Sequence, residues 1–338
     1  MKNFLSINAF LLILFQTLNA QTLESDNFNA YTIGNVGTDI TASVPGQGGF
    51  YTDFPGGSNS EAQIVNIDAF HGKSLQLTGS AGASATKYMW KNGLGTAWAA
   101  RTSGNDILKL SFSLYTGSPT GGVGRGTVLI YDGTTHKTLL GAGYEYDTQR
   151  LVGIAYYTKI ANGVTGNYLF YLEPPAYSYP PNTWITLNCT FNKTTGAVTW
   201  TTPGGVTYGP ASTHVPAAAG VDPFELDFVS VAGAGNTVAH ITSFDDYMVT
   251  ATNNATLVTR EAVAEDPNVS VYPNPAADFI HIQSESPVTK IEIVDIAGRK
   301  KDMHFDHDKI DIRNLTPGIY IISMEIKGSK FSKKFIKK

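Results

Sequence analysis

An acidic motif in the middle of the chain has the spacing that acid–base chemistry on a sugar requires. Glu145 and Asp147 stand two residues apart in the run Tyr-Glu-Tyr-Asp-Thr-Gln-Arg. Side chains two apart on a β-strand share one face, and glycoside hydrolysis uses two carboxyl groups at a defined separation. A complete strand of this kind would read Glu-x-Asp-x-x-Glu, but Arg150 stands where the second Glu would act as the acid. Glu145 and Asp147 are therefore weak catalytic candidates.

Other catalytic motifs are incomplete or missing. Glu225 and Asp227 form a shorter fragment, Glu-Leu-Asp, which is followed by Phe228. The chain contains neither a Gly-x-Ser-x-Gly nucleophile motif nor a His-Glu-x-x-His metal motif. Because no catalytic set is complete, we expect binding rather than catalysis. A polysaccharide hydrolase or lyase that uses Glu145 and Asp147 is the alternative.

Aromatic side chains in two turn-rich segments suit the binding of sugars. Flat rings stack on the apolar faces of sugars, while nearby polar atoms hold the hydroxyl groups. Trp90 and Trp98 flank the segment Lys-Asn-Gly-Leu-Gly-Thr-Ala, and Tyr177 and Tyr179 precede two prolines. We predict that both segments are loops whose exposed rings contact a glycan. The alternative is that these rings pack in a core, as most large rings of a sandwich do.

The composition favours an exported all-β protein. Only 15% of the 338 residues are charged, whereas about 25% are charged in ordinary soluble domains. The net charge of −4 provides no large basic surface, which argues against a nucleic-acid partner. The single cysteine, Cys189, cannot form an intramolecular disulfide, and it excludes a cysteine-type zinc site.

Short alternating apolar segments run through most of the chain. Residues 107–114 alternate cleanly, and residues 127–131 end in Asp-Gly, which is typical of a hairpin turn. No window has a sustained helical period. These patterns predict a large β-sandwich over residues 21–252, a linker over 253–268, and a second, small β-sandwich over 269–338.

The large sandwich resembles the concanavalin A-like, or laminin-G-like, jelly roll. The resemblance lies in the start Asp26-Asn-Phe-Asn-Ala-Tyr-Thr-Ile-Gly, in the end Phe244-Asp-Asp-Tyr-Met-Val, and in the segments 72–77 and 184–200 between them. It implies that the first and last strands pair side by side.

That pairing would bring acidic residues from both ends of the sandwich together. Asp26 would then meet Asp245 or Asp246. Hard cations bind several oxygen ligands, so these acids, helped by backbone carbonyls, are candidates for a structural calcium site. Ordinary surface acids and turn caps are the alternative.

The first twenty residues are typical of an export signal. Lys2 supplies a positive charge, residues 10–15 form an apolar run, and Ala20 places a small residue before the mature chain. The apolar run is shorter than the roughly 20 residues that a membrane-spanning helix needs. We therefore predict a cleaved secretory signal peptide over residues 1–20, and no transmembrane segment.

Four motifs at the C-terminus resemble the sorting domain of the type IX (Por) secretion system of Bacteroidetes. They are Val-Tyr272-Pro273-Asn274-Pro275, Ile-Val-Asp295-Ile-Ala-Gly298-Arg, Asn-Leu-Thr-Pro-Gly318-Ile-Tyr320 and the final Lys-Lys-Phe-Ile-Lys-Lys. The resemblance covers residues 269–338 and implies a small immunoglobulin-like β-sandwich. It also implies two partners, the secretion machinery and a sortase-like protease that usually removes the domain.

The sequence therefore predicts a secreted or outer-membrane cell-surface protein with two parts, a passenger region, called the cargo, and a C-terminal sorting domain. The cargo, residues 21–252, is predicted to be a carbohydrate-binding, lectin-like module. A polysaccharide-degrading enzyme and a structural adhesion protein without a small ligand are the alternatives.

Overall fold

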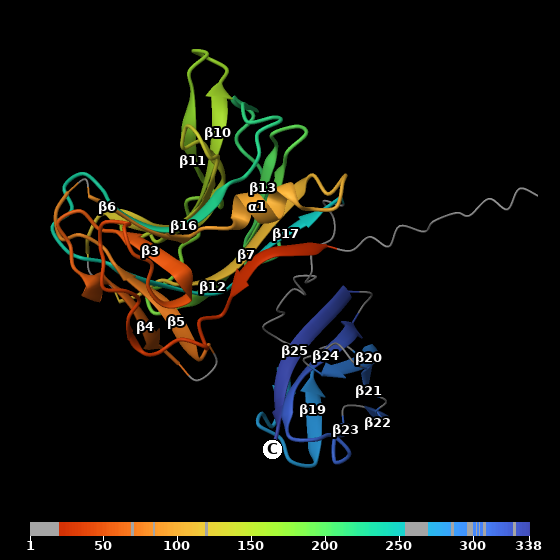
Figure 1. The fold of residues 1–338 in the computed structure, drawn as a ribbon. Helices are drawn as coiled ribbons and strands as arrows, with labels where there is room; N and C mark the ends of the chain where they lie inside the picture. Colours follow the sequence, from red (N-terminus) through yellow and green to blue (C-terminus); the bar gives the residue numbers. More distant parts are fainter. Residues whose placement is uncertain are drawn as a thin grey trace, which may run out of the picture. The chain divides into compact units, whose positions relative to one another are not determined.

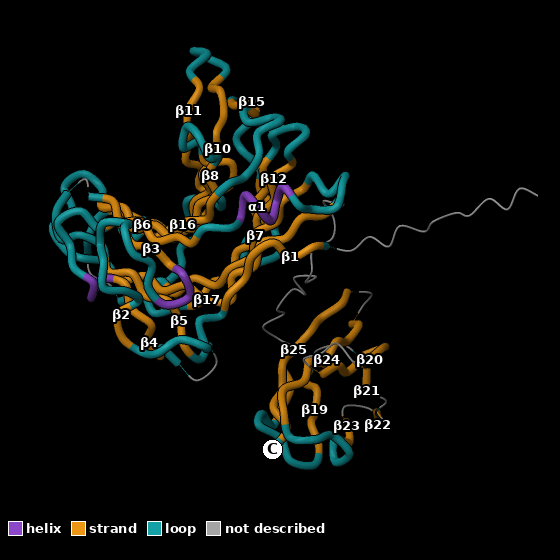
Figure 2. The backbone as a smooth tube through the Cα atoms, in the orientation of Figure 1, coloured by secondary structure: helices purple, strands orange, loops and turns teal. Residues whose placement is uncertain are grey.

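The structure is a computed structural model of the chain. It describes residues 20–338 except 69–70, 84, 119–120, 254–269, 285–286, 296–299, 302, 304, 307–308 and 327–328. The predicted signal peptide (apart from Ala20) and the predicted linker (apart from Asn253) lie outside the described residues. The chain divides into two compact units, built mainly from residues before and after position 258. Both units consist almost entirely of β-strands (Figure 1, Figure 2).

The first unit is a sandwich of two antiparallel sheets. Among the described residues, sheet A has nine strands in the order β14 (Thr207–Tyr208), β13 (Val198–Thr201), β12 (Trp184–Asn192), β7 (Ile107–Tyr115), β17 (Ile241–Thr252), β5 (Lys73–Thr78), β4 (Ala62–Asn66) and β2 (Gly34–Asn35), with β1 (Gln21–Asp26) also paired to β17. Sheet B has eight in the order β11 (Thr165–Tyr171), β10 (Arg150–Lys159), β9 (Thr138–Glu145), β8 (Gly124–Tyr131), β16 (Glu225–Ala232), β6 (Thr86–Lys91) and β3 (Phe50–Asp53), with β15 (His214–Pro216) also paired to β10. Three short helices, η1 (Gln47–Gly49), η2 (Asn59–Glu61) and α1 (Leu94–Ala99), complete the elements.

Apolar side chains from both sheets fill the space between them. The alternation along β7 places Leu108, Leu110, Phe112 and Leu114 in this core, as the sequence predicts. Rings from distant segments pack beside them, with centroids 5.1 to 6.3 Å apart. This ring cluster comprises Phe28, Phe50, Phe228, Phe244 and Tyr247. The predicted β-sandwich is therefore confirmed.

Close packing of β10 against Trp200 yields a testable prediction. Trp200 is fully buried, and its indole N–H donates to the Gly141 carbonyl at 2.7 Å. A Cβ atom at Gly153 would lie 2.4 Å from Cε2 of this indole, whereas a Cβ atom at Gly166 of the neighbouring strand would meet nothing within 4 Å. We expect Gly153→Ala to lower the free energy of unfolding by about 1–3 kcal/mol, the usual cost of overpacking. In urea titrations the control Gly166→Ala should match or slightly exceed the wild type; equal loss in both variants would contradict the packing argument.

The second unit is a small sandwich of two four-stranded sheets. One has the order β18 (Ser270–Tyr272), β19 (Phe279–Gln283), β23 (Lys309–Asp311) and β22 (Phe305–Asp306). The other has the order β21 (Lys300–Lys301), β20 (Val288–Asp295), β24 (Gly318–Ile326) and β25 (Ser329–Lys337). Their core contains Ile280, Ile293, Ile310, Tyr320 and Phe335, each at most 3% exposed. This separate core agrees with the predicted second sandwich.

Candidate functional site

The candidate site lies on the face of sheet B that is turned away from the core, which we call the outer face. Successive side chains of a strand point to opposite faces. On β16, Leu226 and Phe228 belong to the core, so Glu225 and Asp227 belong to the outer face. The same alternation assigns the following residues to the outer face: Tyr51, Tyr88, Trp90, Arg125, Leu129, Tyr131, Gly141, Glu145, Val152, Ile154 and Val229.

Glu225 and Asp227 form a pair of interacting carboxyl groups on this face, at the start of β16. Asp227 is only 5% exposed, and Oδ1 has no hydrogen-bond partner among the described residues. Burial, and then the neighbouring charge of Glu225, raises the pKa of Asp227 well above its usual range. Burial also raises the pKa of Glu225. Two carboxyl groups in contact cannot both ionise cheaply, so the pair retains one proton at neutral pH.

Aromatic residues surround the carboxyl pair. Trp90 of β6 is the cross-strand neighbour of Asp227, and Tyr131 of β8 is the neighbour of Glu225. Trp90 also stacks on Tyr51 of β3, with ring centroids 5.9 Å apart and planes 22° apart. Both rings of this stack are half-buried, so part of each remains available to a ligand.

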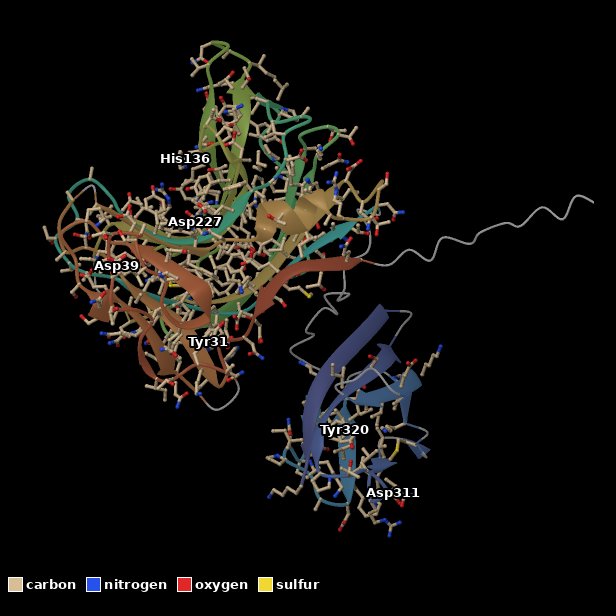
Figure 3. The ribbon with its side chains drawn as sticks, viewed as in Figure 1. Tyr31, Asp39, His136, Asp227, Asp311 and Tyr320 are labelled. Carbon is tan, nitrogen blue, oxygen red and sulfur yellow. The ribbon has the colours of Figure 1, made fainter. Side chains whose placement is uncertain are left out.

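Histidine and tyrosine side chains add polar groups to the same region. His136 lies edge-on to Tyr131, with centroids 5.9 Å apart. Figure 3 shows His136 and Asp227 on the same side of the first unit. Burial, and next the charge of Asp227, raises the pKa of the Tyr88 and Tyr131 phenols, so both remain protonated donors. The outer face thus combines flat rings with hydroxyl and carboxyl groups.

The acidic pair that the sequence favours is divided between two places. Strand β9 ends at Glu145, and residues 146–149 form a turn, so Asp147 does not share a strand face with Glu145. The prediction that the two carboxylates face the same way is therefore wrong. Glu145 lies on the outer face, where its Oε2 accepts hydrogen bonds from Tyr171 and Thr148, each at 2.7 Å.

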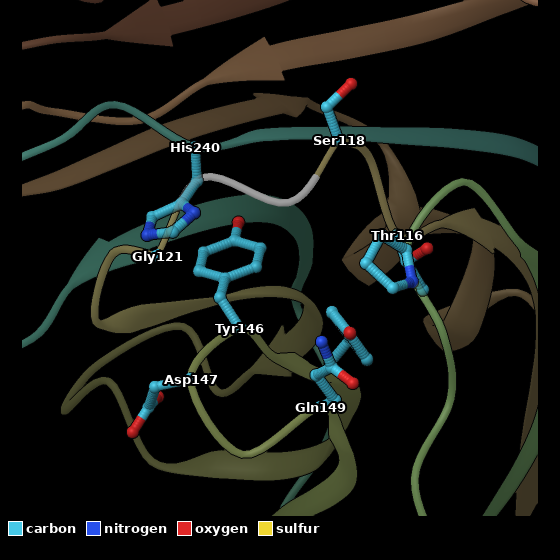
Figure 4. A pocket seen from close by; sticks show the side chains of 9 residues that line it. Thr116, Ser118, Gly121, Tyr146, Asp147, Gln149 and His240 are labelled. Atoms are coloured by element: carbon cyan, nitrogen blue, oxygen red, sulfur yellow. The ribbon is translucent and has the colours of Figure 1, made fainter.

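Asp147 instead lines a pocket at one end of the sandwich (Figure 4). The pocket encloses about 280 Å³, and segments far apart in the sequence form its wall. Tyr146 stacks on His240, with centroids 3.8 Å apart, and its hydroxyl pairs with Thr242. Burial lowers the pKa of His240, which keeps the imidazole neutral. The wall also contains Thr116, Ser118, Gly121, Tyr144, Gln149 and Pro181.

The four predicted ligand-binding rings have different environments. Trp98 is 1% exposed because residues 94–99 form α1, and its indole N–H donates to Asp222 at 2.6 Å. The prediction of an exposed loop ring at this position is wrong. Tyr177 is 61% exposed, as predicted. Tyr179 is half-buried and donates to Glu173 at 2.9 Å. Trp90 is the only one of the four on the outer face.

The three predicted calcium ligands do not form a metal cage. The pairing of β1 with β17 that the resemblance implies is present. However, the Asp26 carboxylate accepts hydrogen bonds from the Phe28 amide and the Tyr31 hydroxyl, and Lys91 lies 3.7 Å away. Among the described residues, no three His, Cys, Asp or Glu side chains are grouped to hold a metal ion. As placed, Asp26, Asp245 and Asp246 do not fit a calcium ion, and calcium binding stays a prediction.

The second unit displays its opening motif on the surface and buries a later one. Tyr272 is 47% exposed and stacks on His281, while Pro273 and Pro275 are exposed. The Asn274 side-chain oxygen accepts from the Ile336 amide at 2.9 Å.

The later motif leads into β24 of the second sheet of this unit. Tyr320, two residues after Gly318, is buried against Phe335. The backbone of Asp295 pairs with Tyr320, whereas Gly298 lies outside the described residues.

Comparison with protein families decides the role of this second unit. Residues 270–338 match the family described as the secretion system C-terminal sorting domain. This segment is a C-terminal sorting domain of type IX secretion. The sorting domain marks the chain for secretion or cell-surface export and implies contact with the type IX machinery. Within the described residues, no helix is long and apolar enough to span a membrane.

Comparisons of the whole chain find only distant similarity. No curated protein sequence matches it. The Trypanosoma rangeli sialidase in complex with DANA matches at 12% identity and TM-score 0.38, over 70% of this chain and 30% of the sialidase. Cellulose induced protein Cip1 matches at 14% identity and TM-score 0.40, over 64% of this chain and 96% of Cip1. The Chlorella virus alginate lyase vAL-1 matches at 9% identity and TM-score 0.38, over 60% of this chain and 93% of the lyase. The chain thus spans less than a third of the sialidase.

The fragment Glu225-Leu-Asp227 has no role in the sequence-based predictions. The two acids of this fragment have the same spacing as Glu145 and Asp147, and they alternate with the apolar residues of the segment from Phe224 to Val229. An acid within such a run is expected to be buried, and a buried acid has a raised pKa. The Glu145 motif lacks this context, because polar residues follow it.

Proposed function

We propose that the first unit is a glycan-binding module, which the sorting domain delivers to the cell surface or the medium. One observation carries the proposal: the half-buried Tyr51–Trp90 stack lies directly beside the Glu225–Asp227 pair on one sheet face. Aromatic rings cover the apolar face of a sugar, and carboxyl oxygens accept hydrogen bonds from its hydroxyls. Delivery would follow removal of a signal peptide, and a sortase-like protease would then cut off the sorting domain.

Affinity for glycans tests this proposal through Trp90. We expect the purified first unit, screened on arrays of bacterial, algal and host polysaccharides, to retain at least one of them. Trp90→Ala should weaken that binding about tenfold or more, because it removes both a stacking surface and the partner of Tyr51. Tyr208→Ala, a ring at the far edge of sheet A, is the matched control and should bind as the wild type does.

Two results would contradict the assignment. If no glycan is retained, the first unit is not a glycan-binding module, and the structural adhesion alternative gains support. If Tyr177→Ala removes binding while Trp90→Ala does not, the site is the exposed loop near Tyr177 rather than the outer face. Circular dichroism of each variant ensures that a lost signal reflects the site and not unfolding.

A second candidate function is cleavage of a polysaccharide, which the carboxyl pair favours. One protonated and one ionised carboxyl group are the components of acid–base catalysis. The test is release of reducing or unsaturated sugar ends by the wild type and by Glu225→Gln. Release that this substitution abolishes would support an enzyme. Binding without any release would leave the module a lectin, and release that only Glu145→Gln abolishes would move the catalytic site to Glu145.

A further inference from the structure

The pocket at one end of the first unit has no role in the proposed function. It encloses about 280 Å³, and none of its described lining residues belongs to the outer face (Figure 4). Ser118, Gly121 and Asp147 of the lining are exposed, so the pocket opens to solvent. Pockets for drug-sized ligands enclose about 300–1,000 Å³. A pocket just below this range suits a ligand with a single ring.

Hydrogen bonds between distant segments hold the wall of this pocket in place. The Thr116 hydroxyl donates to the Pro180 carbonyl at 3.1 Å and accepts from the Thr183 amide at 3.0 Å. The Tyr144 hydroxyl donates to the Tyr179 carbonyl at 3.0 Å. The wall is therefore formed before a ligand arrives, which reduces the entropy cost of binding.

Two other polar side chains of the lining are not used in this way. Among the described residues, the Asp147 carboxylate and the Gln149 amide form no hydrogen bond or ion pair. In the view of Figure 4, both lie below the ring of Tyr146. The amide has two donor hydrogens and an acceptor oxygen, and the carboxylate accepts only. This combination matches sugar hydroxyls, each of which donates one hydrogen bond and also accepts.

The remaining lining residues favour an uncharged ligand with an apolar face. Tyr146 and His240 are stacked, and Pro181 adds a further apolar surface; such surfaces pack against the C–H groups of a sugar ring. The described lining contains no lysine or arginine, so an anionic ligand would meet only the negative charge of Asp147. A cationic ligand would gain little from this carboxylate, because solvent-exposed ion pairs are weak.

We propose that this pocket is a second binding site, which takes one uncharged sugar unit of a glycan. The sugar ring packs against the wall of Tyr146 and His240, and its hydroxyls form hydrogen bonds with Asp147 and Gln149. The site is separate from the outer face, so either site can be removed by substitution without the other.

Binding of single sugars to the full chain tests this proposal. The neutral probes are the methyl glycosides of glucose, galactose, mannose, xylose and fucose. The charged probes are methyl glucuronide, which is anionic, and methyl glucosaminide, whose amine is cationic when protonated. Saturation-transfer NMR should detect binding of at least one neutral probe, and neither charged probe should displace it more effectively than the neutral probe itself does.

Two substitutions remove the pocket in different ways. Gln149 has a φ of +55°, which glycine adopts without strain, so Gln149→Gly deletes the amide and leaves the turn intact. We expect it to weaken sugar binding about tenfold or more, because hydrogen bonds to the ligand are lost. Ser118→Phe places a ring at the exposed mouth of the pocket and should abolish binding by excluding the sugar.

Each substitution has a matched control outside the pocket. Ala42→Gly also introduces glycine at a positive φ, +59°, and Ser212→Phe also places a ring at an exposed serine. Both controls should bind the sugar as the wild type does, and so should Trp90→Ala, which changes only the outer face. Thermal melting of every variant verifies that a lost signal does not reflect unfolding.

The outcomes distinguish this site from the outer face. Loss of the signal in both pocket variants, with binding retained in Trp90→Ala, supports a second site whether or not the outer face binds glycans. If no neutral probe binds, or if Gln149→Gly and Ser118→Phe bind as the wild type does, the pocket is not a sugar site and the proposed function is unaffected. Preference for a charged probe, abolished by Ser118→Phe, would overturn the assignment to an uncharged sugar.

Discussion

Removal of residues 270–338 should abolish delivery of the protein to the cell surface or the medium. These residues match the sorting domain, and their two small sheets have a core of their own. Deletion therefore removes the sorting domain and leaves the separate core of the first unit intact. In the native host, cell fractionation and protease accessibility should show the truncated chain inside the outer membrane, while the full-length chain is exposed or released.

The control for this deletion is the fold of the cargo. The truncated chain, purified, should melt cooperatively and retain the ring cluster of the first unit, as reported by near-ultraviolet circular dichroism. A folded cargo that stays inside the cell assigns the export signal to the last 69 residues. Unchanged surface delivery of the truncated chain would instead show that these residues are not required for export.

Neutralising Asp245 should stabilise the first unit at neutral and alkaline pH. Asp245 is fully buried in β17, and burial, followed by the charge of Asp246, raises its pKa to about 7. In the unfolded chain this carboxyl group ionises near its ordinary pKa of 3.8. Between these values the folded state binds a proton that the unfolded state has lost, so stability falls as the pH rises through this window.

Asp245→Asn removes this dependence because an amide does not ionise. We expect the variant to match the wild type near pH 4 and to exceed it above pH 7 by up to about 4 kcal/mol, since each pKa unit corresponds to about 1.4 kcal/mol. Guanidinium titrations of both proteins across this range measure the difference. Equal slopes of stability against pH in the two proteins would contradict the assignment to Asp245.

The same pair of proteins tests the predicted calcium site. A calcium ion requires an ionised Asp245 and would stabilise the wild type at alkaline pH but not the variant. From the geometry we expect added calcium, or a chelator, to leave both melting temperatures unchanged. The reason is that Asp26 is already engaged by Phe28, Tyr31 and Lys91. Selective stabilisation of the wild type by calcium would reverse that expectation.

Local patterns along the chain are sufficient to predict the strands but not to predict α1. The alternation of Leu108, Leu110 and Phe112 has the period of a strand with one buried face, and the structure confirms it. Residues 94–99 form less than two helical turns, which is too short for a helical period to show. The sequence pattern therefore predicts a loop at Trp98, although a hydrogen bond to Asp222, more than a hundred residues later, holds the indole inside.

The spacing of the two acid pairs does not show which pair is buried, because burial depends on contacts with neighbouring strands. Glu145–Asp147 and Glu225–Asp227 have identical spacing. In the folded chain, the strand that carries Glu145 ends before Asp147, while β16 continues past Asp227 between β6 and β8. Burial by these two neighbouring strands raises the pKa of Asp227, and no local motif encodes which strands will flank β16.

The amino-acid sequence by itself determined the all-β class, the alternation of buried and exposed positions, and the sorting domain at the C-terminus. These properties depend on residues close together in the chain, where period, turn chemistry and motif order are visible. The tertiary structure alone decided that Trp90 lies beside Asp227, that Trp98 is buried, and that the Glu225–Asp227 pair retains a proton. Protonation and exposure depend on desolvation and neighbouring charge, which arise only when distant strands pack together.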